Sequence, residues 1–106
     1  MEAGKLRERI TLQTQVITQD AELNAITTWT DWQTVWAESL AKTSREFFRL
    51  ATSNAEITRV FRIRYIGGVN ARQRVVFKGK QLEMVGEPDN EGERDVSILI
   101  ACKGVS

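Results

Sequence analysis

The stretch 29-WTDWQTVW-36 decides between two folds, because its pattern suits both a helix and a strand. It holds all three tryptophans of the 106-residue chain, at positions 29, 32 and 36. Spacings of three and seven residues would line one face of a helix, whereas Trp32, Thr34 and Trp36 alternate as on one face of a strand. Valine, threonine and tryptophan suit a pleated sheet and lose rotamer freedom in a helix. We therefore predict a strand over residues 32–40, with Trp32 and Trp36 on one face and Trp29 in the loop before it.

Alternating apolar and polar residues predict further strands on both sides of this stretch. The pattern is strongest over residues 56–66, where Phe61 and Ile63 face away from Val60 and Arg62. The other predicted strands are residues 9–17, two strands flanking the turn 78-KGK-80, and an apolar central strand over residues 96–102. The weakly apolar residues 18–31 predict a long loop, and loops of this length in a compact domain usually have a function.

One short helix is predicted over residues 44–53. Thr43 and Glu46 form a capping box at its start. The helix is too short to be stable alone, so its apolar face must dock on the rest of the domain. That face consists of Phe47, Leu50 and Ala51, with Phe48 beside it.

The fold class follows from the number and order of these elements. About six short strands without strand–helix alternation predict a mainly β fold, an antiparallel barrel or sandwich with one helix and a long loop. The length of the chain predicts a single domain over residues 1–106.

Composition excludes several functions. A net charge of +1 argues against a general polyanion binder. The chain has no histidine, the commonest general base and metal ligand, and no catalytic motif, so we predict no enzyme, cofactor or metal. The single Cys102 lies in an apolar stretch and predicts a buried, inert thiol in a reducing compartment. No stretch approaches the apolar length of a membrane span, and no signal peptide is expected.

Charged residues form two groups whose roles the sequence leaves open. The arginines of residues 59–74 are compatible with a phosphate patch, a solvated strand face or a subunit contact. The acidic segment 89–95 lacks the ligand spacing of a calcium loop and keeps a polar loop soluble. A subunit contact would join these groups across two copies of the chain, and its candidate residues are Arg62, Arg64, Arg72, Arg74, Asp89, Glu91, Glu93 and Asp95.

The tryptophans offer a similar choice between nucleobase stacking and packing. A stacking platform usually has basic residues between its rings. Asp31 and Glu38 flank these rings instead. Packing is therefore the favoured interpretation.

Four stretches in order resemble the head–tail joining family of long-tailed phages, whose members are also called head-closure or head-completion proteins. These stretches are GKLRERITLQ, DWQTVWAES, EFFRLATSNAEITRVFRIRYI and VVFKGKQLEMVGEPDNEGERDVSILIACKGV. Each is a weak signal alone, but the ordered set covers nearly the whole chain.

The resemblance implies a small β-barrel with one helix and a structural role without catalytic residues. It implies a homo-oligomeric ring, commonly twelve-fold, beneath the portal and its adaptor and above a tail-completion protein. Such a ring closes the DNA-filled head, lets DNA pass without sequence-specific binding, and offers the tail its attachment site. The expected location is the head–tail interface of the virion, after assembly in the host bacterial cytoplasm. The long loop is expected to face the channel with Asp20, Glu22 and Asn24.

Two alternatives remain open beside this function. One is a small barrel that binds nucleic acid through its arginine strand, with an affinity that falls steeply with salt. The other is a related neck or tail-terminator ring protein.

Overall fold

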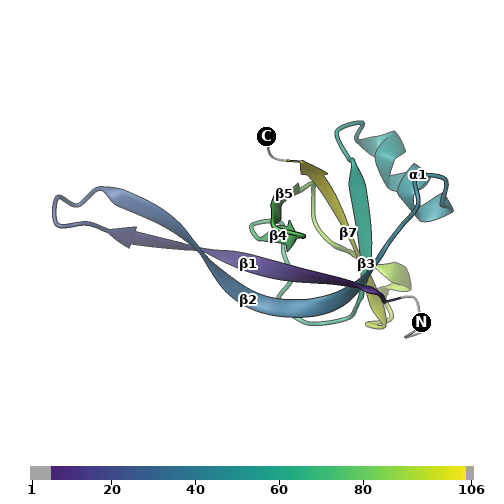
Figure 1. Cartoon of the computed structure of the whole chain (residues 1–106), viewed down its shortest axis with the longest axis horizontal. Coiled ribbons are helices and arrows are strands. Elements are labelled where there is room, and N and C mark those ends of the chain that lie inside the picture. The colour runs from purple at the N-terminus through teal and green to yellow at the C-terminus, as the bar shows by residue number, and fades with distance from the viewer. Residues whose placement is uncertain (1–5, 105–106) are drawn as a thin grey trace.

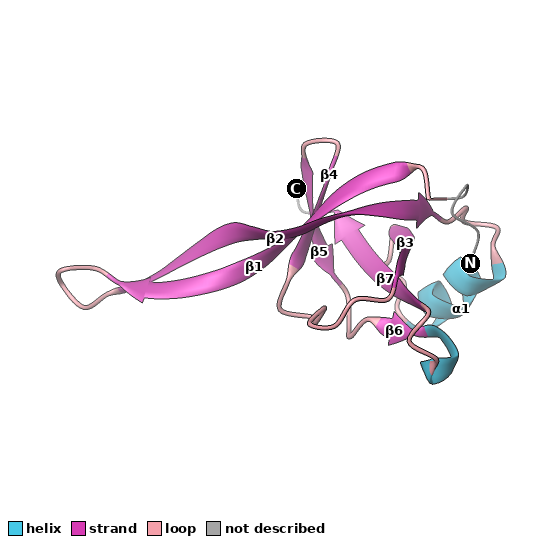
Figure 2. Ribbon diagram, turned by 90° about the horizontal axis from the view of Figure 1, so that it is seen from below, coloured by secondary structure: helices cyan, strands magenta, loops and turns pink. Residues whose placement is uncertain are grey.

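A computed structural model describes residues 6–104 of the chain. Most of these residues lie in strands (Figures 1 and 2). The elements are β1 (Glu8–Gln19), β2 (Ala25–Ser39), α1 (Arg45–Ser53), β3 (Arg59–Arg64), β4 (Arg74–Phe77), β5 (Lys80–Met84), β6 (Asp89–Asn90), the 3-10 turn η2 (Glu91–Glu93) and β7 (Ser97–Gly104).

The strand pairings close on themselves, as in a small barrel. β1 pairs with β2 and β4, β2 also pairs with β3, and β7 pairs with both β3 and β5. The pairing of β4 with β5 completes the circuit, and every pairing is antiparallel. The predicted mainly β fold with one short helix is therefore confirmed.

β7 lies between two apolar clusters. This position explains why its sequence is apolar on both faces. Ile98 and Ile100 point into the barrel interior, where they pack with Phe61 and other strand residues. Leu99 and Ala101 alternate with them and join the cluster beneath α1. Because side chains of a strand alternate between faces, a strand covered on both sides carries apolar residues throughout. The predicted central strand is confirmed.

Helix α1 docks on the outside of the barrel through the predicted face. Phe47 is buried against the second cluster, and Leu50 and Ala51 pack beside it. The predicted cap was wrong by one residue: Ser44 is the N-cap, and its hydroxyl accepts a hydrogen bond from the Phe47 amide at 3.2 Å. Both Thr43 and Ser44 suit an N-cap, so only backbone geometry distinguishes them.

The tryptophan stretch is a strand, as predicted, but its three rings do not share one face. β2 already includes Trp29, and the pairing of β1 with β2 shifts register between Leu12 and Gln13, leaving Trp32 unpaired in a bulge. Trp32 therefore packs against the barrel core, whereas Trp36 is 53% exposed on the other face. A bulge reverses the alternation of side chains, which periodicity alone does not reveal.

The predicted loop over residues 18–31 was wrong, because most of this segment continues β1 and β2 as a long hairpin (Figure 1). Residues 14–19 pair with residues 25–30, and only residues 20–24 form the turn. Nearly all of these side chains are exposed, so no buried face imposes an apolar–polar alternation. The threonines and isoleucines of the segment nevertheless favour strands.

Two other predicted elements hold with changed limits. The strand expected over residues 56–66 begins at Arg59 and ends at Arg64, which leaves Tyr65 outside it and 40% exposed. The predicted hairpin at residues 78–80 is confirmed, and Lys78 and Gly79 both have positive φ at its turn. The polar segment 88–95 adds the short strand β6 to the edge of β7.

Candidate functional site

The hairpin projects from the barrel as an arm, here defined as residues 14–30, and gives the molecule extents of 50 × 27 × 27 Å (Figure 1). The sequence has no lysine or arginine between residues 10 and 41. Asp20 and Glu22 therefore leave the arm negatively charged. Such a surface repels nucleic-acid phosphates.

Asp20 holds the turn at the end of the arm. Its Oδ1 accepts hydrogen bonds from the amides of Glu22 and Asn24, both at 2.9 Å. These donors favour the ionised carboxylate and lower the pKa of Asp20, with the Asn24 amide as the main cause. Asp20 is thus a structural residue of the turn, and Glu22 presents an exposed carboxylate beside it.

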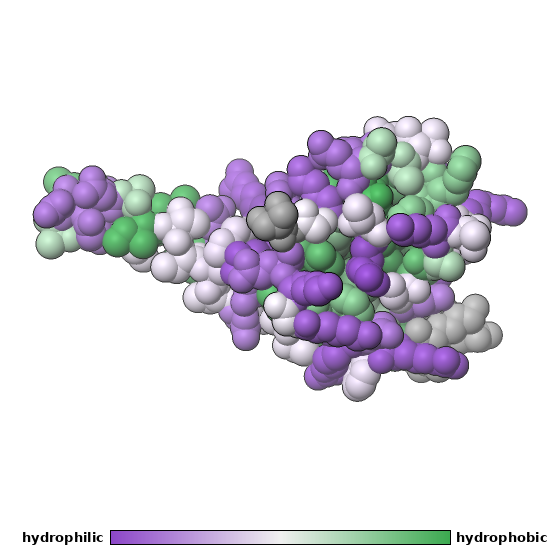
Figure 3. Space-filling model, turned by 45° about the horizontal axis from the view of Figure 1, so that its top comes forward, coloured by the Kyte–Doolittle hydropathy of each residue, from purple (hydrophilic) through white to green (hydrophobic). Residues whose placement is uncertain are grey.

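Apolar side chains gather around the same turn. Ile17 and Leu23 are 66% and 74% exposed. Val16 and Ile26, with smaller exposures, lie on the face of the ribbon opposite Ile17, because Ile17 pairs with Thr27 whereas Ile26 pairs with Thr18. Figure 3 shows hydrophobic side chains interspersed with hydrophilic ones near the far end of the arm. We call these four residues the apolar tip. Large apolar side chains exposed on both faces of one projecting segment are consistent with an interaction site.

Two tryptophans are covered by arginines. The Arg74 guanidinium lies 4.4 Å from the Trp29 ring centre, and its Nε donates to the Gln13 side chain at 2.7 Å. Arg9 lies 4.7 Å from the ring centre of Trp36. Packing is therefore the correct interpretation for Trp32, while the other two rings form cation–π contacts at the surface.

Arg62 lies at the centre of a carboxylate cluster within its own chain. Its guanidinium contacts Glu91 at 2.7 Å, Glu38 at 3.0 Å and Glu46 at 3.3 Å. The hydrogen bonds to Glu91 are the main cause that raises the pKa of Arg62, and the same bonds lower the pKa of Glu91. Ser97 also donates to Glu91 at 2.8 Å. Arg62 and Glu91, two of the candidates for a contact between copies, thus pair with each other within one chain.

The other candidate interface residues are divided between internal contacts and free surface. Asp89 pairs with Arg49 at 2.7 Å, and Asp95 accepts from the Asn90 side chain at 2.7 Å. Arg74 is engaged with Trp29, as described above. Arg64, Arg72 and Glu93 are exposed.

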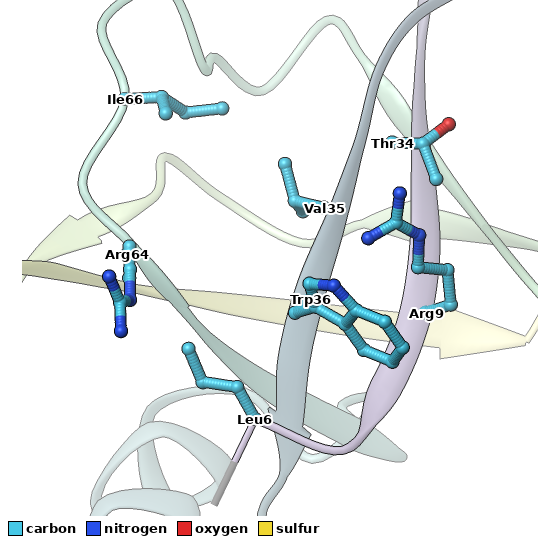
Figure 4. A pocket seen from close by; sticks show the side chains of 7 residues that line it. All are labelled: Leu6, Arg9, Thr34, Val35, Trp36, Arg64 and Ile66. Carbon is cyan, nitrogen blue, oxygen red and sulfur yellow. The ribbon is translucent and has the colours of Figure 1, made fainter. Parts of the chain in front are cut away.

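A groove lies on the barrel beside the start of β1 and the end of β2 (Figure 4). Its cavity volume is about 460 Å³, and its apolar wall is formed by Leu6, Val35, Trp36 and Ile66. Arg9 and Arg64 add two guanidinium groups to the lining. The sequence did not indicate this groove. The groove forms because β2 and β3 pair only over residues 37–39 and 61–63, so that the chain after β3 separates from β2.

Residues 6–104 contain no group of three or more His, Cys, Asp or Glu side chains arranged to hold a metal ion. No helix in this range has the length and apolarity needed to cross a membrane. Cys102 is buried, as predicted, and desolvation raises the pKa of its thiol to about 12.

Comparison with known proteins agrees with these features. The model of the phage head completion protein family matches residues 1–104. Protein SF1141 from Shigella flexneri 2a, known from a solution structure, is 31% identical and has a TM-score of 0.76, with 100% of this chain and 98% of that chain covered.

A chain of the virion of a native gene transfer agent particle shares the fold, with a TM-score of 0.63, 15% identity and coverage of 94% and 96%. No curated protein matches the sequence. The family match over nearly the entire chain, together with the first of these structures, shows that this chain belongs to the phage head completion protein family.

Proposed function

We propose that this protein is a structural subunit of a ring in a phage or prophage neck. The ring lies beneath the portal and adaptor, closes the DNA-filled head, and provides the attachment site for a tail-completion protein. The observation that carries this proposal is the family match over residues 1–104. The resemblance suggests twelve copies. The proposed location is the head–tail interface of the virion, after assembly in the host cytoplasm.

The surface chemistry supports a structural role over nucleic-acid binding. Arg62 is neutralised by three glutamates, and Arg74 is engaged with Trp29 and Gln13. The arm that extends from the barrel carries acidic but no basic side chains. DNA would therefore pass such a ring without being held by the arm.

Reconstitution tests the proposal. Tailless, DNA-filled heads that lack this protein are mixed with the purified chain and then with tails. We expect DNA to become resistant to nuclease and infectious particles to form. Heads that neither bind the protein nor retain their DNA would contradict the function. A salt-sensitive affinity for free DNA would favour the nucleic-acid module instead.

A further inference from the structure

The end of the arm exposes apolar side chains of the kind that another protein surface usually covers. Leu23 and Ile17 are its most exposed apolar residues. The family resemblance implies that this segment faces a channel. A segment that remained in the water of a channel would gain nothing from these side chains, because apolar surface is stabilised by removal from water.

The groove beside the start of β1 and the end of β2 is complementary to that end. Its wall is apolar, and Arg9 and Arg64 lie at its sides (Figure 4). Neither arginine forms an ion pair with another residue of the described range 6–104. The arm supplies apolar side chains beside the carboxylates of Asp20 and Glu22, and it carries no positive charge.

A chain cannot fill its own groove with its own arm. Arg9 and Trp36 pair across the base of the hairpin, whereas Gln19 and Ala25 pair next to the turn. Ten residues of strand separate the two pairs, which at about 3.3 Å per residue corresponds to roughly 33 Å. A twisted ribbon of this length, in a molecule 50 Å long, holds its turn far from the groove, so the partner is a separate molecule.

We propose that the apolar tip of one copy docks into the groove of the next copy in the ring. Leu23 and Ile17 would contact Trp36 and the other apolar wall residues, and Glu22 would approach Arg64. The contact joins two different surfaces and leaves a free tip and a free groove at its ends, so it repeats from copy to copy until the ring closes. This inference rests on the proposed ring function and assigns its subunit contact.

Crosslinking of assembled heads tests this contact directly. Ala21 at the turn and Thr34 at the groove are exposed and are replaced together by cysteine, which leaves the proposed contact residues in place. The native Cys102 is buried and its thiol pKa is raised to about 12, so it does not react. After treatment with a short bismaleimide, we expect a ladder of covalent multimers. Each single cysteine variant should give no ladder.

Charge reversal provides a second, independent test. Glu22→Arg and Arg64→Glu should each reduce the yield of DNA-retaining heads at least roughly tenfold, because each brings like charges together. The double variant should recover most of this loss. Arg72→Glu is the matched control, because Arg72 is exposed but does not line the groove. Unchanged thermal unfolding would show that each variant remains folded.

The outcomes separate this contact from the ring function. If the unmodified protein seals heads but the double cysteine variant gives no ladder, or the double charge variant recovers nothing, the docking is wrong and the function stands. Crosslinks from residue 34 to another neck protein would also overturn it. If the unmodified protein does not join heads, the proposed function itself fails.

Discussion

Arg62 and Glu91, separated by 29 residues in sequence, are joined by two hydrogen bonds of 2.7 and 3.2 Å. The same guanidinium contacts Glu38 on β2 and Glu46 on α1. One cation thus connects four segments of the fold around a site that is only partly open to water. Arg62 in this position stabilises the fold of the single subunit.

Replacing Arg62 by methionine should therefore destabilise the free subunit. The substitution keeps much of the side-chain volume but leaves three carboxylates without their cation. We expect a loss of about 1.5–3 kcal/mol in the free energy of unfolding, the range for hydrogen bonds to charged groups. Urea unfolding measures it. Arg64→Met is the control, because Arg64 is exposed and should change stability by no more than about 0.5 kcal/mol.

The same cluster makes combined charge reversal of Arg62 and Arg64 unsuitable as an interface test. From the sequence, both arginines are candidates for a subunit contact, beside a phosphate patch and a solvated strand face. Glutamate at position 62 would add a fourth carboxylate to three that already converge there. The added repulsion would destabilise the fold, so a failure of this variant to assemble would not report on the interface, and Arg64 alone is the informative position.

Acid should weaken the subunit through Glu91. Arg62 lowers the pKa of Glu91 below its ordinary value of 4.5 in the folded state, so the unfolded chain takes up this proton first as pH falls. The stabilisation is complete above about pH 4.5 and is lost as pH falls through the folded pKa. Glu91→Gln should be less stable at about pH 7 yet lose less on acidification. If the free energy of unfolding fell equally with pH in the parent and in Glu91→Gln, the acid sensitivity would belong to other groups.

Helix docking depends on one of two adjacent phenylalanines. Phe47 is 6% exposed and packs against the cluster beneath α1, whereas Phe48 is 70% exposed. Phe47→Ala should cost about 3–5 kcal/mol, because it removes a buried ring and leaves a cavity. Phe48→Ala removes the same atoms from the surface and should cost no more than about 0.5 kcal/mol. Thermal unfolding compares the two; similar melting temperatures would mean that α1 packs by another face.

The sequence predicted those parts of the fold that a buried face controls. Ile10 and Leu12 revealed β1, and the apolar run of β7 revealed a strand covered on both sides. The arm beyond residue 17 was missed because neither of its faces is buried, so the alternation of its side chains carries no apolar signal. Its threonines and isoleucines were the only indication of a strand there, and their preference is weak outside a sheet context.

The contacts of the candidate site were less predictable than the strands. Residue type identified Arg62 and Glu91 as charged surface candidates, but their partners depend on register: Glu38 faces Arg62 only because β2 and β3 pair at Ala37–Ile63. The bulge at Trp32 reversed the faces of the tryptophans for the same reason. The pairing of strands far apart in the sequence decides both the partners of Arg62 and the faces of the tryptophans. A single sequence does not show this pairing directly.

Gly68 should be intolerant of a side chain, unlike its neighbour Gly67. Gly68 has a φ of 97°, and an added Cβ would lie 2.8 Å from Cζ2 of Trp32, whereas a Cβ at Gly67 would meet nothing within 4 Å. Gly68→Ala combines backbone strain with a clash against a packed ring, so we expect a loss of at least about 1–3 kcal/mol. Gly67→Ala is the matched control. Chemical unfolding of the two variants should separate them clearly.

The arm should be the least stable part of the free subunit, although it is folded as a strand pair. β1 pairs with both β2 and β4 at residues 10–13, but beyond Gln13 it pairs with β2 alone. A two-stranded ribbon without a third strand or a buried face is only marginally stable in water. Its amides should therefore exchange hydrogen much faster than those of β7, which has a neighbour on each side.

Assembly should change this exchange at the turn itself. If the tip docks in the next copy, amides of residues 20–24 become slow in assembled necks, because the contact must break before they open. If the tip faces the channel, these amides stay exposed to water and remain fast. The amides of Leu99 and Ile100 serve as the control, since they are paired in β7 in either state. Slow exchange along the arm of a demonstrated monomer would show that the ribbon is stable alone, and protection would then report nothing about docking.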